Sequence, residues 1–188
     1  MSSSFDYESN FISSVLPELE SYLLGKDLFR LTRLSAPSGL PPYPSLTLGT
    51  LLFSLLKARA LAAHPKQTAQ ITHLEHEINA YRQRWRSAWE KKAYSEAQNR
   101  SAMWRTFLGE LYSAPAENLD RYPYEVRQRL IIELLKDEID AAPTGLQKEI
   151  EQSDSLLRGM LKPAQFIWPS ELEPSFPADR FWFLWGKP

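Results

Sequence analysis

The chain has 188 residues, of which 43% are hydrophobic and 24% are charged, and its formal net charge is −1. This length fits one domain, or one domain with an ordered tail, and the apolar content is enough to bury a core, so wholesale disorder is excluded. The absence of cysteine excludes disulfides, thiolate nucleophiles, iron–sulfur clusters and thiolate zinc sites. The small net charge gives no bulk attraction for nucleic acid or for a membrane.

Neither a secretory signal nor a membrane-spanning helix is recognisable. The sequence begins MSSSFDYESN, without a basic segment followed by a long apolar one. The most apolar stretch covers residues 46–56 and is followed by Lys57 and Arg59, whereas a spanning helix needs about 20 apolar residues. We therefore predict a buried core helix there, no membrane association and a cytoplasmic location.

The first expected helix covers residues 5–24, where apolar side chains recur at spacings of three and four. Pro17 lies inside this pattern, and because a mid-helix proline costs about 3 kcal/mol, we expect the helix to break there. Residues 28–34 are ambiguous between a strand and a helical turn. The four prolines of residues 35–45 predict a loop.

Residues 66–112 carry the longest helical pattern, after an apolar helix expected at about residues 46–63. Apolar positions over residues 71–88 form a narrow seam of coiled-coil type, but beyond residue 90 the apolar side chains lie about 100° further around the helix. Either the helix breaks near Ser95–Asn99, or one long helix changes its packing partner there. A straight helix of this span would be about 70 Å long, so we favour two helices or a projecting arm.

The last two helices are expected at about residues 123–141 and from Pro143 to about residue 161, the second with a narrow apolar seam over residues 146–160. Residues 163–188 differ, because they combine five prolines with seven Phe and Trp residues. Such a segment suits extended structure, and a short β-hairpin is possible. We expect it to fold back onto the helices, because an aromatic tail left in water would be sticky.

The sequence thus predicts a mainly α fold, an irregular multi-helix bundle across which the aromatic, proline-rich C-terminal segment packs. Residues 1–162 would form the helical bundle, and residues 163–188 would be an extended segment integral to the same domain. Within that segment we expect Trp168, and at least one of Trp182 and Trp185, to be largely buried.

Basic residues gather between residues 57 and 105, which hold ten Lys and Arg against four Asp and Glu. Arginines neutralise phosphates and exposed tryptophans stack on bases, so one interpretation is a nucleic-acid or phosphate surface. The residues that would contact such an anion are Arg82, Arg84, Arg86, Lys91, Arg100 and Arg105. The simpler interpretation is that Trp85 continues the apolar seam as core, while the arginines pair with the acidic helix at residues 123–141.

Two further groups of residues could hold a metal ion. His73 and His76 stand three positions apart on an expected helix, a spacing that allows both imidazoles to reach one ion. They project opposite the apolar seam, so we interpret them as solvated and predict no metal site. The acidic residues Glu133, Asp137, Glu138 and Asp140 lack the Glu-x-x-His partner of a di-iron bundle, and we expect a solvated face.

No motif for catalysis or for cofactor binding occurs in the sequence. It has no G-x-G-x-x-G turn, no P-loop, no H-E-x-x-H pair and no G-x-S-x-G elbow. We therefore expect no cofactor and a non-enzymatic interaction or adaptor module that self-associates or binds another protein. The alternative is a nucleic-acid-binding protein that uses the basic helix around residues 82–105. An enzyme with a pocket under the C-terminal segment stays open.

Overall fold

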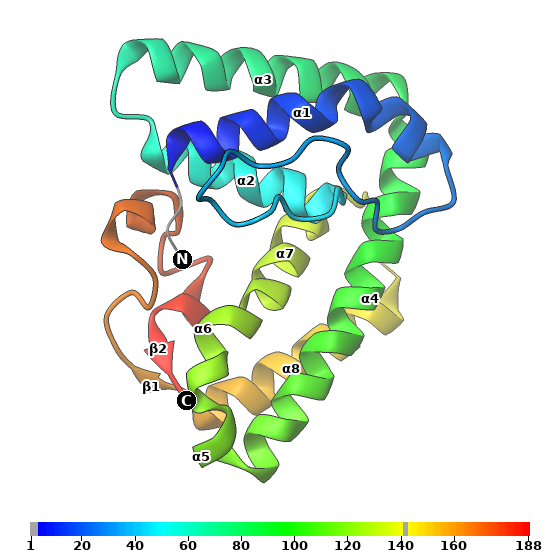
Figure 1. Cartoon of the computed structure of the whole chain (residues 1–188). Helices are drawn as coiled ribbons and strands as arrows, with labels where there is room; N and C mark the ends of the chain where they lie inside the picture. The colour runs from blue at the N-terminus through cyan, green and yellow to red at the C-terminus, as the bar shows by residue number, and fades with distance from the viewer. Residues whose placement is uncertain (1–3, 141–142) are drawn as a thin grey trace. The chain divides into compact units, whose positions relative to one another are not determined.

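The computed structural model describes residues 4–140 and 143–188 and is mainly helical, as the sequence predicts (Figure 1). The chain divides into two compact units, Met1–Glu96 and Ala97–Pro188. The described residues form the α-helices α1 (Phe5–Leu24), α2 (Leu48–Leu61), α3 (Pro65–Arg84), α4 (Arg86–Ser113), α5 (Pro115–Asn118), α6 (Tyr122–Glu125), α7 (Arg127–Lys136) and α8 (Thr144–Met160). They also form the strands β1 (Lys162–Pro163) and β2 (Gly186–Lys187) and three short 3₁₀ helices at Leu119–Arg121, Ser170–Ser175 and Trp182–Leu184.

The first unit contains α1, α2 and α3, which pack against one another (Figure 1). The expected break at Pro17 is wrong, because α1 runs through this proline as one helix of 20 residues. Phe11 and Val15 before the proline are fully buried, and so are Leu19 and Tyr22 after it. Burial of this apolar face on both sides of Pro17 offsets the backbone hydrogen bond that the proline removes.

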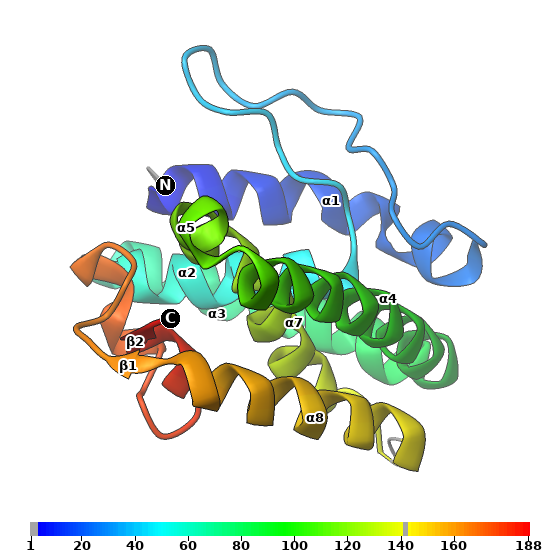
Figure 2. The ribbon, with the colours of Figure 1, turned by 90° about the horizontal axis from the view of Figure 1, so that it is seen from below.

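A long loop connects α1 to α2 and extends away from both helices (Figure 2). Within it, residues 28–34 form neither a helical turn nor a regular strand. The backbone of Arg30 exchanges two hydrogen bonds with that of Leu46, at N···O distances of 3.1 and 2.7 Å, and the bridge is antiparallel. The proline-rich residues 35–45 are a loop, as predicted.

The break in the long helical pattern lies at Trp85, where α3 ends and α4 begins, and not near Ser95–Asn99. Trp85 leaves the helical region of backbone conformation, with φ −118° and ψ 35°. The expectation of two helices is met, but the predicted position of the break is wrong. Helix α4 continues through Ser95–Asn99 for 28 residues in all.

The shift of the apolar seam between residues 71–88 and the residues beyond 90 coincides with the junction of α3 and α4 at Trp85. Trp89 and Ala93 are fully buried in the first unit, whereas Trp104 and Leu108 are buried in the second. The boundary between the two units falls between Glu96 and Ala97, inside α4. Trp89, Ala93, Trp104 and Leu108 lie within about 100° of arc on α4, so one buried face runs along this helix across the boundary.

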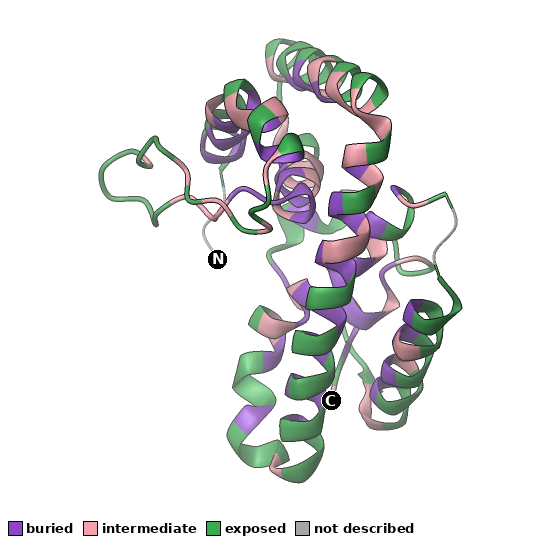
Figure 3. Ribbon diagram, turned by 90° about the vertical axis from the view of Figure 1, so that its right-hand side faces the viewer, coloured by how far each residue is buried: buried purple, intermediate pink, exposed green. Residues whose placement is uncertain are grey.

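The second unit continues with short helices before α7 and α8. The helix expected at about residues 123–141 is divided into α6 and α7, and α7 ends at Lys136. In α8 the seam is confirmed by burial of Leu146, Ile150, Ser153 and Leu157 (Figure 3). The spacings of these positions are the three and four residues of a helix with one buried face.

The C-terminal segment is closed by the antiparallel pair β1 and β2, in which Lys162 lies opposite Lys187 and Pro163 opposite Gly186. The hairpin interpretation is thus confirmed in type, and the two short strands lie at the two ends of the segment. Between the strands, aromatic rings pack on one another, as Trp168 does on Phe176 with ring centroids 5.6 Å apart.

Two hydrogen bonds tie the C-terminal segment to the helices of its own unit. The hydroxyl of Tyr122 donates to the carbonyl oxygen of Phe183 at 2.6 Å, and the indole nitrogen of Trp168 donates to that of Pro123 at 2.8 Å. Trp168 is buried, as expected, but Trp182 and Trp185 are both only half-buried. The buried rings are instead phenylalanines, which have no polar atom to satisfy: Phe176, Phe181 and Phe183.

The assignment of residues 1–162 and 163–188 to a single domain stays a prediction. In the described part of the chain, no helix combines the length and the apolar character that crossing a membrane would require.

Candidate functional sites

The basic residues near the junction of α3 and α4 lie beside aromatic rings, Arg82 half-buried and Arg84 exposed. Arg82 donates to the side-chain oxygen of Asn79 at 2.9 Å, and its guanidinium lies 5.2 Å from the ring centroid of Trp89. Arg84 lies 5.4 Å from the ring of Trp85. Trp89 is fully buried, whereas Trp85 and Arg82 are half-buried. The indole that belongs to the core is therefore Trp89 and not Trp85.

The other candidate basic residues are distributed along α4. Arg86 pairs with Glu90 at 2.5 Å. Arg100 is buried in the second unit and donates to the side-chain oxygen of Gln128 at 2.8 Å, and Arg105 lies 3.7 Å from Glu149.

Lys91, the remaining candidate, is exposed and lines a cavity in the first unit. The arginines thus have contacts within their own units, and binding of an external anion by the six residues stays a prediction.

The histidines lie at the surface of the first unit. His73 is 3.7 Å from a carboxylate oxygen of Glu77 and is exposed. His73 and His76 share an open depression with His64, at the start of α3. Among the described residues, no three His, Cys, Asp or Glu side chains come together in a way that could hold a metal ion.

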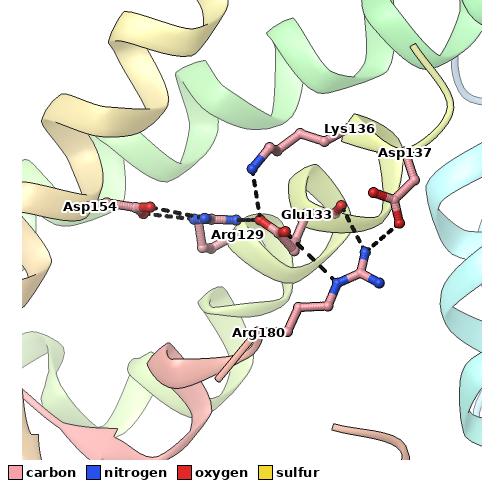
Figure 4. Close-up of polar contacts among 6 residues, drawn as sticks. All are labelled: Arg129, Glu133, Lys136, Asp137, Asp154 and Arg180. Carbon is pink, nitrogen blue, oxygen red and sulfur yellow. Dashed lines mark hydrogen bonds and ion pairs between the residues drawn. The ribbon is translucent and has the colours of Figure 1, made fainter. Parts of the chain in front are cut away.

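The most developed cluster of charges lies in the second unit, around Arg129 of α7 (Figure 4). Arg129 is only 3% exposed. It donates to both carboxylate oxygens of Asp154 on α8, at 2.7 and 2.9 Å, and to Glu133 on its own helix at 3.0 Å. Burial alone would lower the pKa of Arg129, but the two carboxylates raise it above its ordinary value. Its guanidinium also lies 4.9 Å from the ring of Phe183.

Arg180 extends this cluster into the C-terminal segment. It pairs with Asp137 at 2.6 Å and with Glu133 at 3.8 Å, while Lys136 approaches Glu133 at 3.4 Å (Figure 4). Burial alone would raise the pKa of Glu133, but Arg129 and Lys136 lower it below its ordinary value. The acidic residues were expected to form a solvated face. Glu133 instead joins α7 to the C-terminal segment through Arg180, so we interpret this cluster as structural.

A buried carboxylate lies at the N-terminus of α2 in the first unit. Glu96 is fully buried and accepts hydrogen bonds from the hydroxyl of Thr47 at 2.6 Å and from the backbone N–H of Gly49 at 2.9 Å. Thr47 is the N-cap residue of α2 and forms a capping box with Thr50. A carboxylate at a helix N-terminus is stabilised by the helix dipole and by the N–H groups that lack a partner inside the helix.

A cavity of about 450 Å³ lies in the first unit, between the end of α1 and the first half of α4. Its charged lining residues are Lys26, Lys91 and Lys92. Sequence reasoning selected Lys91 and missed the other two. The one signal for Lys92 was that it occupies a position where the seam of the long helical pattern requires an apolar residue.

Exposed apolar side chains gather on the loop between α1 and α2. Phe29, Leu31, Leu34 and Leu40 are 44%, 83%, 60% and 39% exposed. This loop was missed as a candidate site, because its proline content indicated only a connection. The alternation of apolar and basic residues in LFRLTRL was the available signal.

No protein-family model, no curated protein and no solved structure matches this chain, so its function has to be argued from its own residues.

Proposed function

We propose that this chain is a protein-interaction module that self-associates through the loop between α1 and α2. The observation that carries the proposal is the exposure of Phe29, Leu31, Leu34 and Leu40 within 12 consecutive residues. A single exposed leucine is ordinary, but several on one short segment mark an interaction surface. Full burial of one such side chain contributes about 1.5–3 kcal/mol, which an intermolecular contact would gain.

The backbone of the same loop supports pairing with another chain. Arg30 is bonded to Leu46 on one edge, and successive residues of an extended chain direct their N–H and C=O groups to opposite edges. The backbone N–H and C=O of Leu31 therefore face the edge opposite to Leu46. Across residues 4–140 and 143–188 these two groups have no hydrogen-bond partner. An exposed edge of this kind is a template for an added strand.

A second copy of the chain is the occupant that fits best. Antiparallel pairing of two identical segments is two-fold symmetric, which is the commonest symmetry of homo-oligomers. Centred on Leu31, it would place the two Leu31 side chains together and Phe29 of each copy beside Arg33 of the other. Arg33 has a side chain that is 85% exposed, and a cation beside an aromatic ring is favourable. Like charges would not face one another in this register.

Nucleic-acid binding has less support. Arg86, Arg100 and Arg105 have partners within the chain, namely Glu90, Gln128 and Glu149. A phosphate would have to compete with these contacts.

Sedimentation velocity over about 1–100 μM, the range of weak interfaces, tests the proposal. We expect a concentration-dependent shift toward a dimer for the native chain and a monomer for Leu31→Asp, because a charge at the centre of the contact would be desolvated. Leu156→Asp is the matched control, since Leu156 is a 38% exposed leucine on α8. A native chain that stays monomeric over this range, or equal dissociation by both variants, contradicts the proposal.

A further inference from the structure

The cavity at the end of α1 has a mixed lining. Leu23 and Leu28 form part of its apolar wall, and Lys26, Lys91, Lys92 and the hydroxyl-bearing Ser95 form its polar part. None of its described lining residues is Asp or Glu. Its volume of about 450 Å³ is within the range of ligand pockets in proteins.

Lys92 gives this cavity its unusual electrostatics. Lys92 is only 7% exposed, its ammonium donates to the carbonyl oxygen of Asp27, and this ammonium lies 4.6 Å from the ring centroid of Tyr22. An ammonium has three donor hydrogens, so one contact with a carbonyl oxygen leaves capacity for another acceptor. Burying a charged group is costly unless it is paired.

The charges around Lys92 do not balance. Burial lowers the pKa of Lys92, Asp27 opposes this shift, and Arg30 and Lys91 lower the pKa further. The carboxylate of Asp27 is itself paired with Arg30 at 3.2 Å. Positive charge is therefore in excess at the cavity, and a bound anion would compensate it.

We propose that this cavity binds a small organic anion, a carboxylate or a phosphate carried on an apolar body. The ammonium groups of Lys26, Lys91 and Lys92 face the anionic group, the hydroxyl of Ser95 donates a hydrogen bond, and the leucines contact the apolar body. This site is separate from the exposed apolar side chains that carry self-association. Its test does not depend on the oligomeric state.

Isothermal titration calorimetry with four probes at constant ionic strength tests the chemistry. Octanoate and phenyl phosphate each carry an anion on an apolar body, octanol has the body alone, and inorganic phosphate has the anion alone. For ligands of this size we expect saturable binding of the first two with a Kd of about 0.1–1 mM. Octanol and inorganic phosphate should bind at least about tenfold more weakly, because each loses one class of contact.

Variants then locate the site. Lys26→Ala and Lys91→Ala should each weaken octanoate binding by about threefold to tenfold, because each removes one ionic contact at an exposed position. Lys92→Met keeps an unbranched apolar side chain without the charge and should weaken binding by more than about tenfold. The matched control is Lys66→Ala, which removes an exposed lysine from α3 outside the cavity.

The two exposed lysines keep the test valid if Lys92→Met does not fold. Equal affinity for octanol and octanoate would overturn the proposal, and so would equal affinity for inorganic phosphate and phenyl phosphate. Native affinity in both Lys26→Ala and Lys91→Ala would overturn it as well, as would a loss in Lys66→Ala equal to theirs.

Discussion

Arg129 is held in the interior of the second unit by two carboxylates, so the loss of either leaves a buried cation short of a partner. Asp154 supplies two of its hydrogen bonds. We expect Asp154→Ala to lower the free energy of unfolding by about 3–5 kcal/mol, the cost of breaking a buried ion pair. Urea denaturation followed by tryptophan fluorescence measures this loss.

Glu149→Ala is the matched control, because it removes a carboxylate from the exposed pair with Arg105. That pair should contribute less than about 1 kcal/mol. If the two variants lose equal stability, Arg129 does not depend on Asp154. The double variant with Arg129→Met and Asp154→Leu should recover much of the loss, because an apolar pair of similar size replaces the buried charges.

The lowered pKa of Glu133 makes the stability of the second unit depend on pH. The charged groups that face its carboxylate are Arg129, Lys136 and Arg180. A carboxyl group whose pKa is lower in the folded chain stabilises the fold above its unfolded pKa, and this contribution is lost as the pH falls through the folded pKa. The melting temperature of the native chain should therefore exceed that of Glu133→Gln most near neutral pH.

The difference between these melting temperatures should shrink once the pH falls below 4.5, the ordinary pKa of the group. Thermal unfolding of both chains from pH 7 to pH 3 measures it. A difference that stays constant over this range would mean that the charge of Glu133 has no part in stability.

At the scale of the elements, α4 provides the clearest test of helix continuity. Amide hydrogens inside a helix exchange slowly, whereas those of the first turn have no partner in the helix. We expect the amides of Ala97, Gln98 and Asn99 to be strongly protected and those of Ser87 and Ala88, just after the junction, to exchange fast. Hydrogen exchange followed by NMR measures both groups. Fast exchange of the amide hydrogens of residues 97–99 would show that the helix breaks near Ser95–Asn99, as predicted from the sequence.

The predicted elements separate the features of the fold that depend on neighbouring residues from those that depend on packing. The apolar helix near residues 46–63 follows from local composition and the seam of α8 from spacing, and both are present. Pro17 has a strong intrinsic cost, but burial of α1 on either side of it decides the outcome. At Trp85 neither glycine nor proline marks the end of α3, so the pattern of apolar residues continues across this position without a sign of the break. The spacing of apolar residues therefore carries no signal for that break.

The candidate sites were less predictable than the helices, for the same reason. Arg129 and Asp154 are separated by 25 positions, and Lys92 meets the backbone of Asp27 across 65. Lys91 could be selected because the sequence around it is basic. The cavity to which it belongs depends on how α4 lies against the end of α1, so Lys26 could not be connected with it.

At the scale of the whole chain, removal of residues 163–188 should disrupt the second unit. The hydrogen bonds of Tyr122 and Trp168 described above join this segment to the helices. Phe176, Phe181 and Phe183 are buried within the segment. We expect a truncated chain that is insoluble, or one that keeps helical circular dichroism while losing its near-ultraviolet signal and binding a hydrophobic dye. These spectra and the sharpness of thermal unfolding are the measurements.

Trp182→Ala is the control within the segment, because this side chain is half-buried and the guanidinium of Arg158 lies over its ring, 3.7 Å from the ring centroid. It should leave the near-ultraviolet signal of the remaining aromatic cluster in place. A truncated chain that keeps its melting temperature would show instead that the segment is a separate docking element.

The contact of Glu96 with Thr47 and Gly49 has a consequence for the order of events during synthesis. The ribosome releases the chain from its N-terminus, so α1, α2 and α3 emerge before the carboxylate that completes the N-terminus of α2. In a nascent chain that stops before residue 96, the hydroxyl hydrogen of Thr47 and the backbone N–H of Gly49 lack this carboxylate acceptor. Maturation of the first unit therefore waits for the middle of α4, and the next residue to leave the ribosome already belongs to the second.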